Sequence, residues 1–229
     1  LGTAPLAAMA LVFPFAMLTQ MMSAGAMGGG VSSAVSRALG AGDKDRATLL
    51  ARHAVAIGGA AGLVYTAVML VGGPFFYRGL GGSDAVLDEA VRYASVMFSG
   101  AVLVWLSNTL ASILRGTGNM RVPSVTIVLS AALQIALGGL LGLGAGPVPR
   151  LGMVGVAIGH LVATAAMVAV LAWFLMSGRA RVKLQLRGQP LRRDLLADIL
   201  RVGALSCLSP VTSVLTVLVF TGLVAHLGV

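Results

Sequence analysis

Residues 151–178 read LGMVGVAIGHLVATAAMVAVLAWFLMSG and contain no Asp, Glu, Lys or Arg. A helix of about 20 apolar residues crosses the ~30 Å hydrocarbon core of a bilayer, so this stretch is long enough to span a membrane. The rest of the chain holds five more uncharged stretches that exceed this length, at 1–36, 53–77, 93–114, 122–149 and 202–229. The pattern therefore predicts an all-α polytopic membrane protein with six transmembrane helices.

The composition of the chain agrees with a membrane protein. Of its 229 residues, 58% are hydrophobic and only 10% are charged, whereas a soluble domain carries about 25% charged residues. Aromatic residues make up 5%, which argues against a protein that binds nucleic acid by base stacking. A single cysteine, Cys207, excludes an internal disulfide and a cysteine-rich metal site within the chain.

Basic residues are distributed unequally among the connections between the predicted spans. The first, third and fifth connections hold 13 of the 16 Lys and Arg residues, and the second and fourth hold only Arg78, Arg92 and Arg150. Basic connections remain in the cytoplasm, so we expect the odd-numbered connections to be cytoplasmic and the membrane to be the inner (plasma) membrane. The net charge of +9 then predicts membrane lipid head groups as partners and no nucleic acid.

The two ends of the chain indicate missing segments. The predicted orientation places Leu1 outside the cell without a preceding signal peptide, so we expect a further helix upstream. The first helix is expected over 5–38, which is longer than a bilayer requires and therefore implies a tilt or a projection into water.

The fifth connection is the longest and the most basic. Its apolar residues recur at helical spacing between 191 and 200, opposite Arg and Asp residues. This pattern predicts an amphipathic helix that lies in the membrane interface and a linker between two helical bundles. The apolar residues are Leu191, Leu195, Leu196, Ile199 and Leu200.

Polar side chains inside the spans are candidates for function because burying them in lipid is costly. The spans contain no acidic or basic residue, which leaves Gln20, Asn108, Gln134 and His160 as the main candidates. They either hydrogen-bond neighbouring helices and stabilise the bundle, which we favour for Asn108, or they line a transport pathway. In a pathway, His160 can titrate near neutral pH.

Signatures of enzymes and metal sites are absent from the sequence. The chain has no His-Glu-x-x-His motif, no Gly-x-Ser-x-Gly motif and no pair of intramembrane carboxylates. Its three histidines fall in different spans. We therefore expect no catalytic residue, no resident cofactor and no metal site.

Three short motifs resemble one family of transporters. Residues 31–43 read VSSAVSRALGAGD, residues 114–123 read LRGTGNMRVP, and residues 151–158 read LGMVGVAI. They resemble, in that order, the loop after helix two, the connection between helices four and five, and the entry into helix six of multidrug and toxic compound extrusion (MATE) transporters.

The resemblance implies a fold of two similar six-helix lobes, with twelve helices in all. Residues 1–178 would supply helices two to six of the N-terminal lobe, 179–200 the cytoplasmic interlobe linker, and 201–229 the first helix of the C-terminal lobe. The implied function is secondary active efflux of a small, cationic drug or toxic metabolite by antiport with H⁺ or Na⁺, with access alternating between the lobes. We expect a monomer.

The sequence departs from the family at the positions that bind the coupling ion. The family's coupling Asp of helix one would precede this chain, and its Asn and Asp of helix five correspond to Gln134 and Gly138. The family's Thr near the start of helix six falls at His160, and the Glu of one branch in helix seven falls near Ser213. The resemblance therefore adds Ser213 to the candidate ion and substrate pathway and leaves the coupling ion undecided.

Two other functions are compatible with the sequence. A flippase for a lipid-linked precursor would need Lys or Arg in its cavity to pair with phosphates, and the six spans contain none. A membrane subunit without transport activity would need no intramembrane carboxylate.

Overall fold

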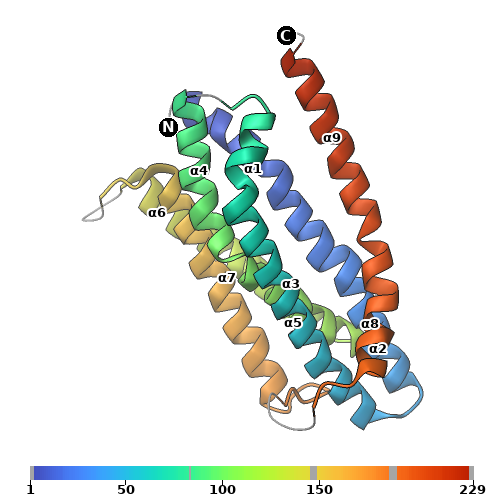
Figure 1. Cartoon of the computed structure of the whole chain (residues 1–229). Helices are drawn as coiled ribbons and strands as arrows, with labels where there is room; N and C mark the ends of the chain where they lie inside the picture. Colours follow the sequence, from blue (N-terminus) through green and yellow to red (C-terminus); the bar gives the residue numbers. More distant parts are fainter. Residues whose placement is uncertain (1–2, 83, 145–148, 186–189, 227–229) are drawn as a thin grey trace.

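The structure is a computed structural model that describes residues 3–82, 84–144, 149–185 and 190–226. Over these residues the chain forms a bundle of long helices joined by short connections (Figure 1). In chain order the elements are α1 (Thr3–Gln20), the π-helix η1 (Met21–Met27), α2 (Gly28–Gly40), α3 (Lys44–Gly79), α4 (Asp84–Ser99), α5 (Ala101–Gly116), α6 (Arg121–Leu143), α7 (Gly152–Met176), α8 (Arg193–Ser206) and α9 (Leu208–His226).

The described helices confirm an all-α polytopic membrane protein. Five of them are long and apolar enough to cross a membrane, and the bent pair α4–α5 raises the number to six. The third predicted span, 93–114, corresponds to two helices, α4 and α5, between which the chain bends by 43°. The bend lies at Gly100, whose missing side chain leaves room for Leu161 of α7.

The first helix runs from Thr3 to Gly40 through α1, η1 and α2, so its length agrees with the expectation of an overlong span. The π-helical segment η1 in its middle has no counterpart among the sequence predictions. A π-helix inside an α-helix is rare and is found most often at functional sites. Here it contains Ser23, whose hydroxyl donates to the Thr19 carbonyl at 2.6 Å.

A side chain caps the helix that follows each of the 31–43 and 114–123 motifs. The Asp43 carboxylate accepts from the Arg46 backbone N–H at 2.8 Å and caps α3. The Asn119 side chain accepts from the Val122 N–H at 3.1 Å at the start of α6. These side chains satisfy backbone N–H groups that have no partner within the helix.

Helices α6 and α7 pack closely along their length. A Cβ on Gly159 would lie 2.5 Å from the Gly138 nitrogen, so the two backbones meet where neither residue has a side chain. Small residues allow such an approach between membrane helices. This contact sets the spacing between the side chains of Gln134 and His160, which flank it.

The connections alternate between the two ends of the bundle. The α2–α3 connection and the approach to α8 lie at the lower end in Figure 1, and the start of α4 lies at the opposite end. Gly116, at the end of α5, packs against Ser32 and Val35 of α2, so the α5–α6 connection also belongs to the lower end. The odd-numbered connections therefore share one end, and its cytoplasmic location remains a prediction.

Helix α8 packs on the bundle through part of its apolar face. Leu195 and Ile199, on its apolar face, are 2% and 0% exposed. A Cβ on Gly30 of α2 would lie 2.8 Å from the Gly203 nitrogen of α8. The predicted amphipathic helix is present as α8. Protein covers Leu195 and Ile199, whereas Leu200 is 37% exposed, and the location of α8 in the membrane interface stays a prediction. Its contact with α2, η1 and α3 is called the linker docking region below.

Polar contacts add to the linker docking region. The Arg192 backbone N–H, at the start of α8, donates to His53 Nε2 at 2.8 Å, and His53 Nδ1 lies 2.7 Å from the Leu49 carbonyl. Asp198 pairs with Arg37 at 2.7 Å and with Arg46 at 2.9 Å. Helix α8 and Arg192 before it are therefore attached to α2 and α3 by apolar, hydrogen-bonded and ionic contacts.

Candidate functional site

Four of the polar residues singled out in the sequence line one cavity of about 190 Å³. Gln20 comes from α1, Asn108 from α5, Gln134 from α6 and His160 from α7. Four helices that are distant in the sequence therefore direct amides and an imidazole at the same space, which we call the polar cavity. Hydroxyl groups on its wall come from Ser107, Ser130 and Thr164.

Asn108 forms a bridge between α5 and the first helix. Its Nδ2 donates to Gln20 Oε1 at 3.1 Å and to Ser23 Oγ at 2.8 Å. Asn108 is buried, whereas Gln20 is exposed to the space beside it. The packing interpretation thus describes Asn108 well, and the same contact holds Gln20 at the edge of the cavity.

Gln134 and His160 form a second pair, between α6 and α7. His160 Nδ1 lies 3.1 Å from Gln134 Oε1. A carboxamide oxygen only accepts, so in this pair Nδ1 carries the hydrogen. The neutral ring then has its lone pair on Nε2.

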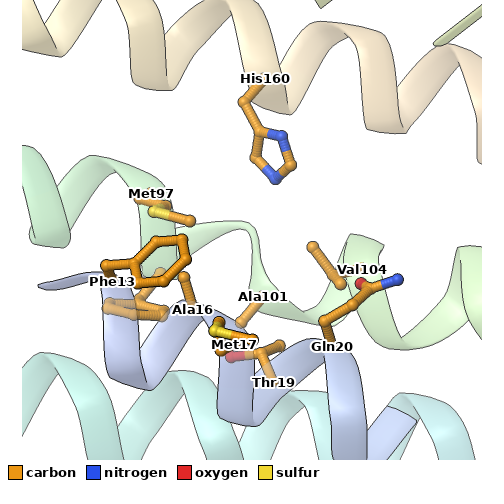
Figure 2. Close-up of a pocket in the computed structure, with 10 residues that line it drawn as sticks. Phe13, Ala16, Met17, Thr19, Gln20, Met97, Ala101, Val104 and His160 are labelled. Atoms are coloured by element: carbon orange, nitrogen blue, oxygen red, sulfur yellow. The ribbon is translucent and has the colours of Figure 1, made fainter. Parts of the chain in front are cut away.

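A second, mainly apolar cavity of about 230 Å³ adjoins the first, and both include Gln20, Val104 and His160 in their walls. Figure 2 shows His160 pointing from α7 into this apolar cavity, across from Phe13 and Met17 of α1. The α4–α5 bend forms another part of the wall. The remaining lining residues are Ala16, Thr19, Met97, Phe98 and Ala101.

The walls of both cavities are uncharged over the described residues. Among the lining residues, His160 is the one whose residue type has an unperturbed pKa between pH 5 and 8. Aromatic faces attract cations, and methionine side chains adapt to ligands of different shape. Together, the paired cavities offer an apolar, polarisable chamber beside a set of neutral hydrogen-bonding groups.

Ser213 lies apart from this group. It is an exposed residue of α9, its hydroxyl donates to the Ser209 carbonyl at 3.0 Å, and it lines neither cavity. The structure therefore brings four of the five predicted residues together and leaves the fifth outside.

Sequence reasoning missed several residues of the site. Ser23 and Thr164 lie one helical turn after Gln20 and His160, and this spacing places each on the same helix face as its predicted neighbour. That periodicity is a usable signal. The apolar residues Phe13, Met17 and Met97 carry no such signal, because lipid-facing and cavity-facing side chains are alike in composition.

Comparison with known proteins agrees with these features. Residues 1–140 match the MatE family. The chain is 26% identical, over its whole length, to the Probable multidrug resistance protein YoeA of Bacillus subtilis, and it covers 50% of that protein. It is also 30% identical to an FAD transporter of Shewanella oneidensis over 164 residues, which are 70% of this chain and 35% of that protein.

Solved structures of transporters are also similar to this chain. An inward-facing multidrug resistance MATE transporter of the MOP superfamily matches 93% of this chain with a TM-score of 0.84 and 31% identity, and 47% of that structure is covered. Other similar structures are of MATE in complex with MaD3S and in complex with Br-NRF. The chain spans about half the length of these proteins. It belongs to the MATE family of multi-pass membrane transporters and is not an enzyme.

Proposed function

We propose that this chain supplies the substrate site of a secondary active exporter. The exporter removes organic cations, drugs or toxic metabolites from the cell by antiport with H⁺ or Na⁺, and access to the site alternates between two lobes. The observation that carries the proposal is the junction of an apolar and a polar cavity at Gln20, Val104 and His160. The relatives and structures with multidrug resistance in their names support it.

The lining chemistry favours a lipophilic cation over an anion. Phe13, Met17 and Met97 present aromatic and thioether groups to the apolar cavity, and such groups accommodate a delocalised positive charge. The amide oxygen of Gln20, at the junction, accepts hydrogen bonds from a ligand that carries N–H groups. Neither cavity wall includes Lys or Arg among the described residues.

The missing basic residues count against a substrate that carries phosphates. A flippase for lipid-linked precursors and a transporter of FAD, such as the Shewanella oneidensis relative, both handle diphosphates, which proteins pair with Lys or Arg. A membrane subunit without transport activity would need no cavity of this kind. A transporter of diphosphates and a subunit without transport activity are the alternative outcomes of the test below.

An efflux assay tests the proposal. Cells that lack their own exporters, and that express the protein from its native gene, should retain less of a fluorescent lipophilic cation than vector controls. Imposing H⁺ and Na⁺ gradients separately identifies the ion. Ala16→Trp fills the apolar cavity and should reduce efflux at least about tenfold.

The matched control is Ala132→Trp, because Ala132 is exposed on α6 and lines neither cavity. It should export at the wild-type rate. Equal loss in both variants, or export of FAD in place of the cation, would contradict the proposed site or substrate class.

The orientation in the plasma membrane is part of the proposal. The lower end of the bundle carries Arg37, Arg46 and Arg179, and the Arg179 guanidinium lies 4.8 Å from the centroid of the Trp173 ring. Such a basic end with an aromatic anchor suits the cytoplasmic surface with its anionic lipids. We also propose that the transporter is a monomer.

Cysteine labelling tests this orientation. In a background without other reactive cysteines, including Cys207→Ser, an impermeant thiol reagent applied to intact cells should label Ala85→Cys at the start of α4. It should not label Leu191→Cys, which precedes α8. The reverse pattern would invert the proposed topology.

A further inference from the structure

His160 occupies a position that distinguishes it from His53, the other histidine whose side chain the structure describes. His53 is buried in the linker docking region, and both of its nitrogens have protein partners. His160 lines both cavities, and of its two nitrogens only Nδ1 has a hydrogen bond within the described part of the chain. Its Nε2 is therefore available to a proton or a ligand.

The surroundings of His160 are uncharged on every element that forms the cavities. Gln20 on α1, Met97 on α4, Asn108 on α5 and Gln134 on α6 are polar or polarisable lining groups on the elements around it. None of them gains or loses charge near neutral pH. Protonation of the ring therefore decides whether this part of the cavity wall is neutral or positive.

The chemistry of the step is simple. The Nε2 lone pair takes up one H⁺, and the imidazole becomes an imidazolium with a hydrogen on each nitrogen. Gln134 Oε1 accepts from Nδ1–H in both states, so the ring keeps its position. The added charge then lies on the wall of the apolar cavity, into which the ring points (Figure 2).

We propose that H⁺ and the cationic substrate exclude each other at His160, which makes this residue the H⁺-exchanging group of the described half of the transporter. The inference rests on the proposed function and names H⁺ as its coupling ion. A cation that enters the apolar cavity expels the proton from Nε2, and a proton that arrives at Nε2 expels the cation. Gln134 acts as a positioning residue that holds the ring at the junction.

The test measures binding of tetraphenylphosphonium to the purified protein, expressed from its native gene, at pH 5.5 and pH 8.0. Calorimetry in buffers of different ionisation enthalpy also gives the number of protons released per cation bound. Two like charges within one cavity should weaken binding about tenfold at the lower pH. Triphenylphosphine oxide, which is neutral and of similar shape, should bind equally at both pH values.

His160→Gln removes the titrating group and retains a polar side chain. It should bind tetraphenylphosphonium with less than about a twofold difference between the two pH values and release no protons. His160→Asn provides a second uncharged variant if the first does not fold. The matched control, His53→Gln, removes the imidazole of the docking region and should keep the wild-type pH dependence.

The outcomes separate the inference from the proposed function. If wild type and His160→Gln bind the cation with the same pH dependence, another group exchanges the proton and the inference is wrong, while the proposed function stands. Loss of the pH dependence in His53→Gln but not in His160→Gln would also overturn it. If wild type binds no cation at either pH, the proposed function fails and the inference fails with it.

Discussion

The linker docking region and the paired cavities use the same kinds of side chain in opposite ways. In the docking region, His53 is 1% exposed and hydrogen-bonded at both nitrogens. In the cavities, His160 is only partly buried and has a hydrogen bond at one nitrogen. Polar groups whose hydrogen bonds are all made within the protein stabilise its structure, whereas polar groups with an unused donor or acceptor are able to bind a ligand. The docking region should therefore determine stability, and the cavities should determine transport.

The largest expected effect comes from His53→Ala. This change leaves a cavity and removes the acceptor of the Arg192 N–H, so the free energy of unfolding should fall by about 3 kcal/mol. Unfolding of the purified protein in detergent measures it. His160→Ala is the matched change in the cavities and should lower the same quantity by about 1 kcal/mol or less. Equal losses in the two variants would remove the distinction between the regions.

A smaller effect is expected for Gly30→Ala. The new Cβ would overlap the backbone of α8 at Gly203 and at the Ile199 carbonyl, each 2.8 Å away, which should cost about 2 kcal/mol. A Cβ on the neighbouring Gly29 would have no packing neighbour within 4 Å. Gly29→Ala should therefore be neutral or slightly stabilising in the same assay, and destabilisation by both variants would show that α8 does not pack on Gly30.

The ion pairs of Asp198 should contribute less. Its side chain is 25% exposed and those of Arg37 and Arg46 are about half exposed, so solvent screens the attraction. Asp198→Asn should cost about 1 kcal/mol, and the cost should shrink in high salt. Asp194→Asn, which breaks the more exposed pair with Arg192, should cost less than Asp198→Asn. A larger loss for Asp194→Asn would reverse this ranking.

The smallest effect on stability is expected at the site itself. Gln134→Ala removes one hydrogen bond between membrane helices, and such bonds contribute about 0.6 kcal/mol on average. Thermal unfolding should hardly change, whereas the pH dependence of lipophilic cation binding should shrink measurably because His160 loses its positioning contact. A variant with lowered stability and an unchanged pH dependence of binding would assign Gln134 to packing alone.

Local composition was enough to predict several features of the fold and the site. Uncharged stretches predicted the membrane spans, and the apolar periodicity of 191–200 predicted an amphipathic helix, because these signals lie within the helix itself. Gln134 and His160 were singled out because an amide or imidazole is rare in a membrane helix. Their mutual hydrogen bond follows from the contact between Gly138 and Gly159, which the sequence alone does not reveal.

The features that were missed depend on contacts between distant residues. The bend at Gly100 reflects Leu161 of α7, and the burial of Leu195 and Ile199 reflects glycine at position 30 of α2. Amphipathic periodicity predicts that one helix face is apolar, and protein or lipid is equally able to cover it. The apolar cavity likewise has no signature in a sequence whose lipid-facing residues are also apolar.

The central claim is that substrate binds where the two cavities meet, and a crystal structure with tetraphenylarsonium tests it most directly. The anomalous signal of arsenic locates the cation independently of the protein density. We predict a peak in the apolar cavity between Phe13 and Met97, adjacent to His160, which disappears in crystals of Ala16→Trp. An arsenic peak confined to other parts of the protein, with an empty cavity, would contradict the account.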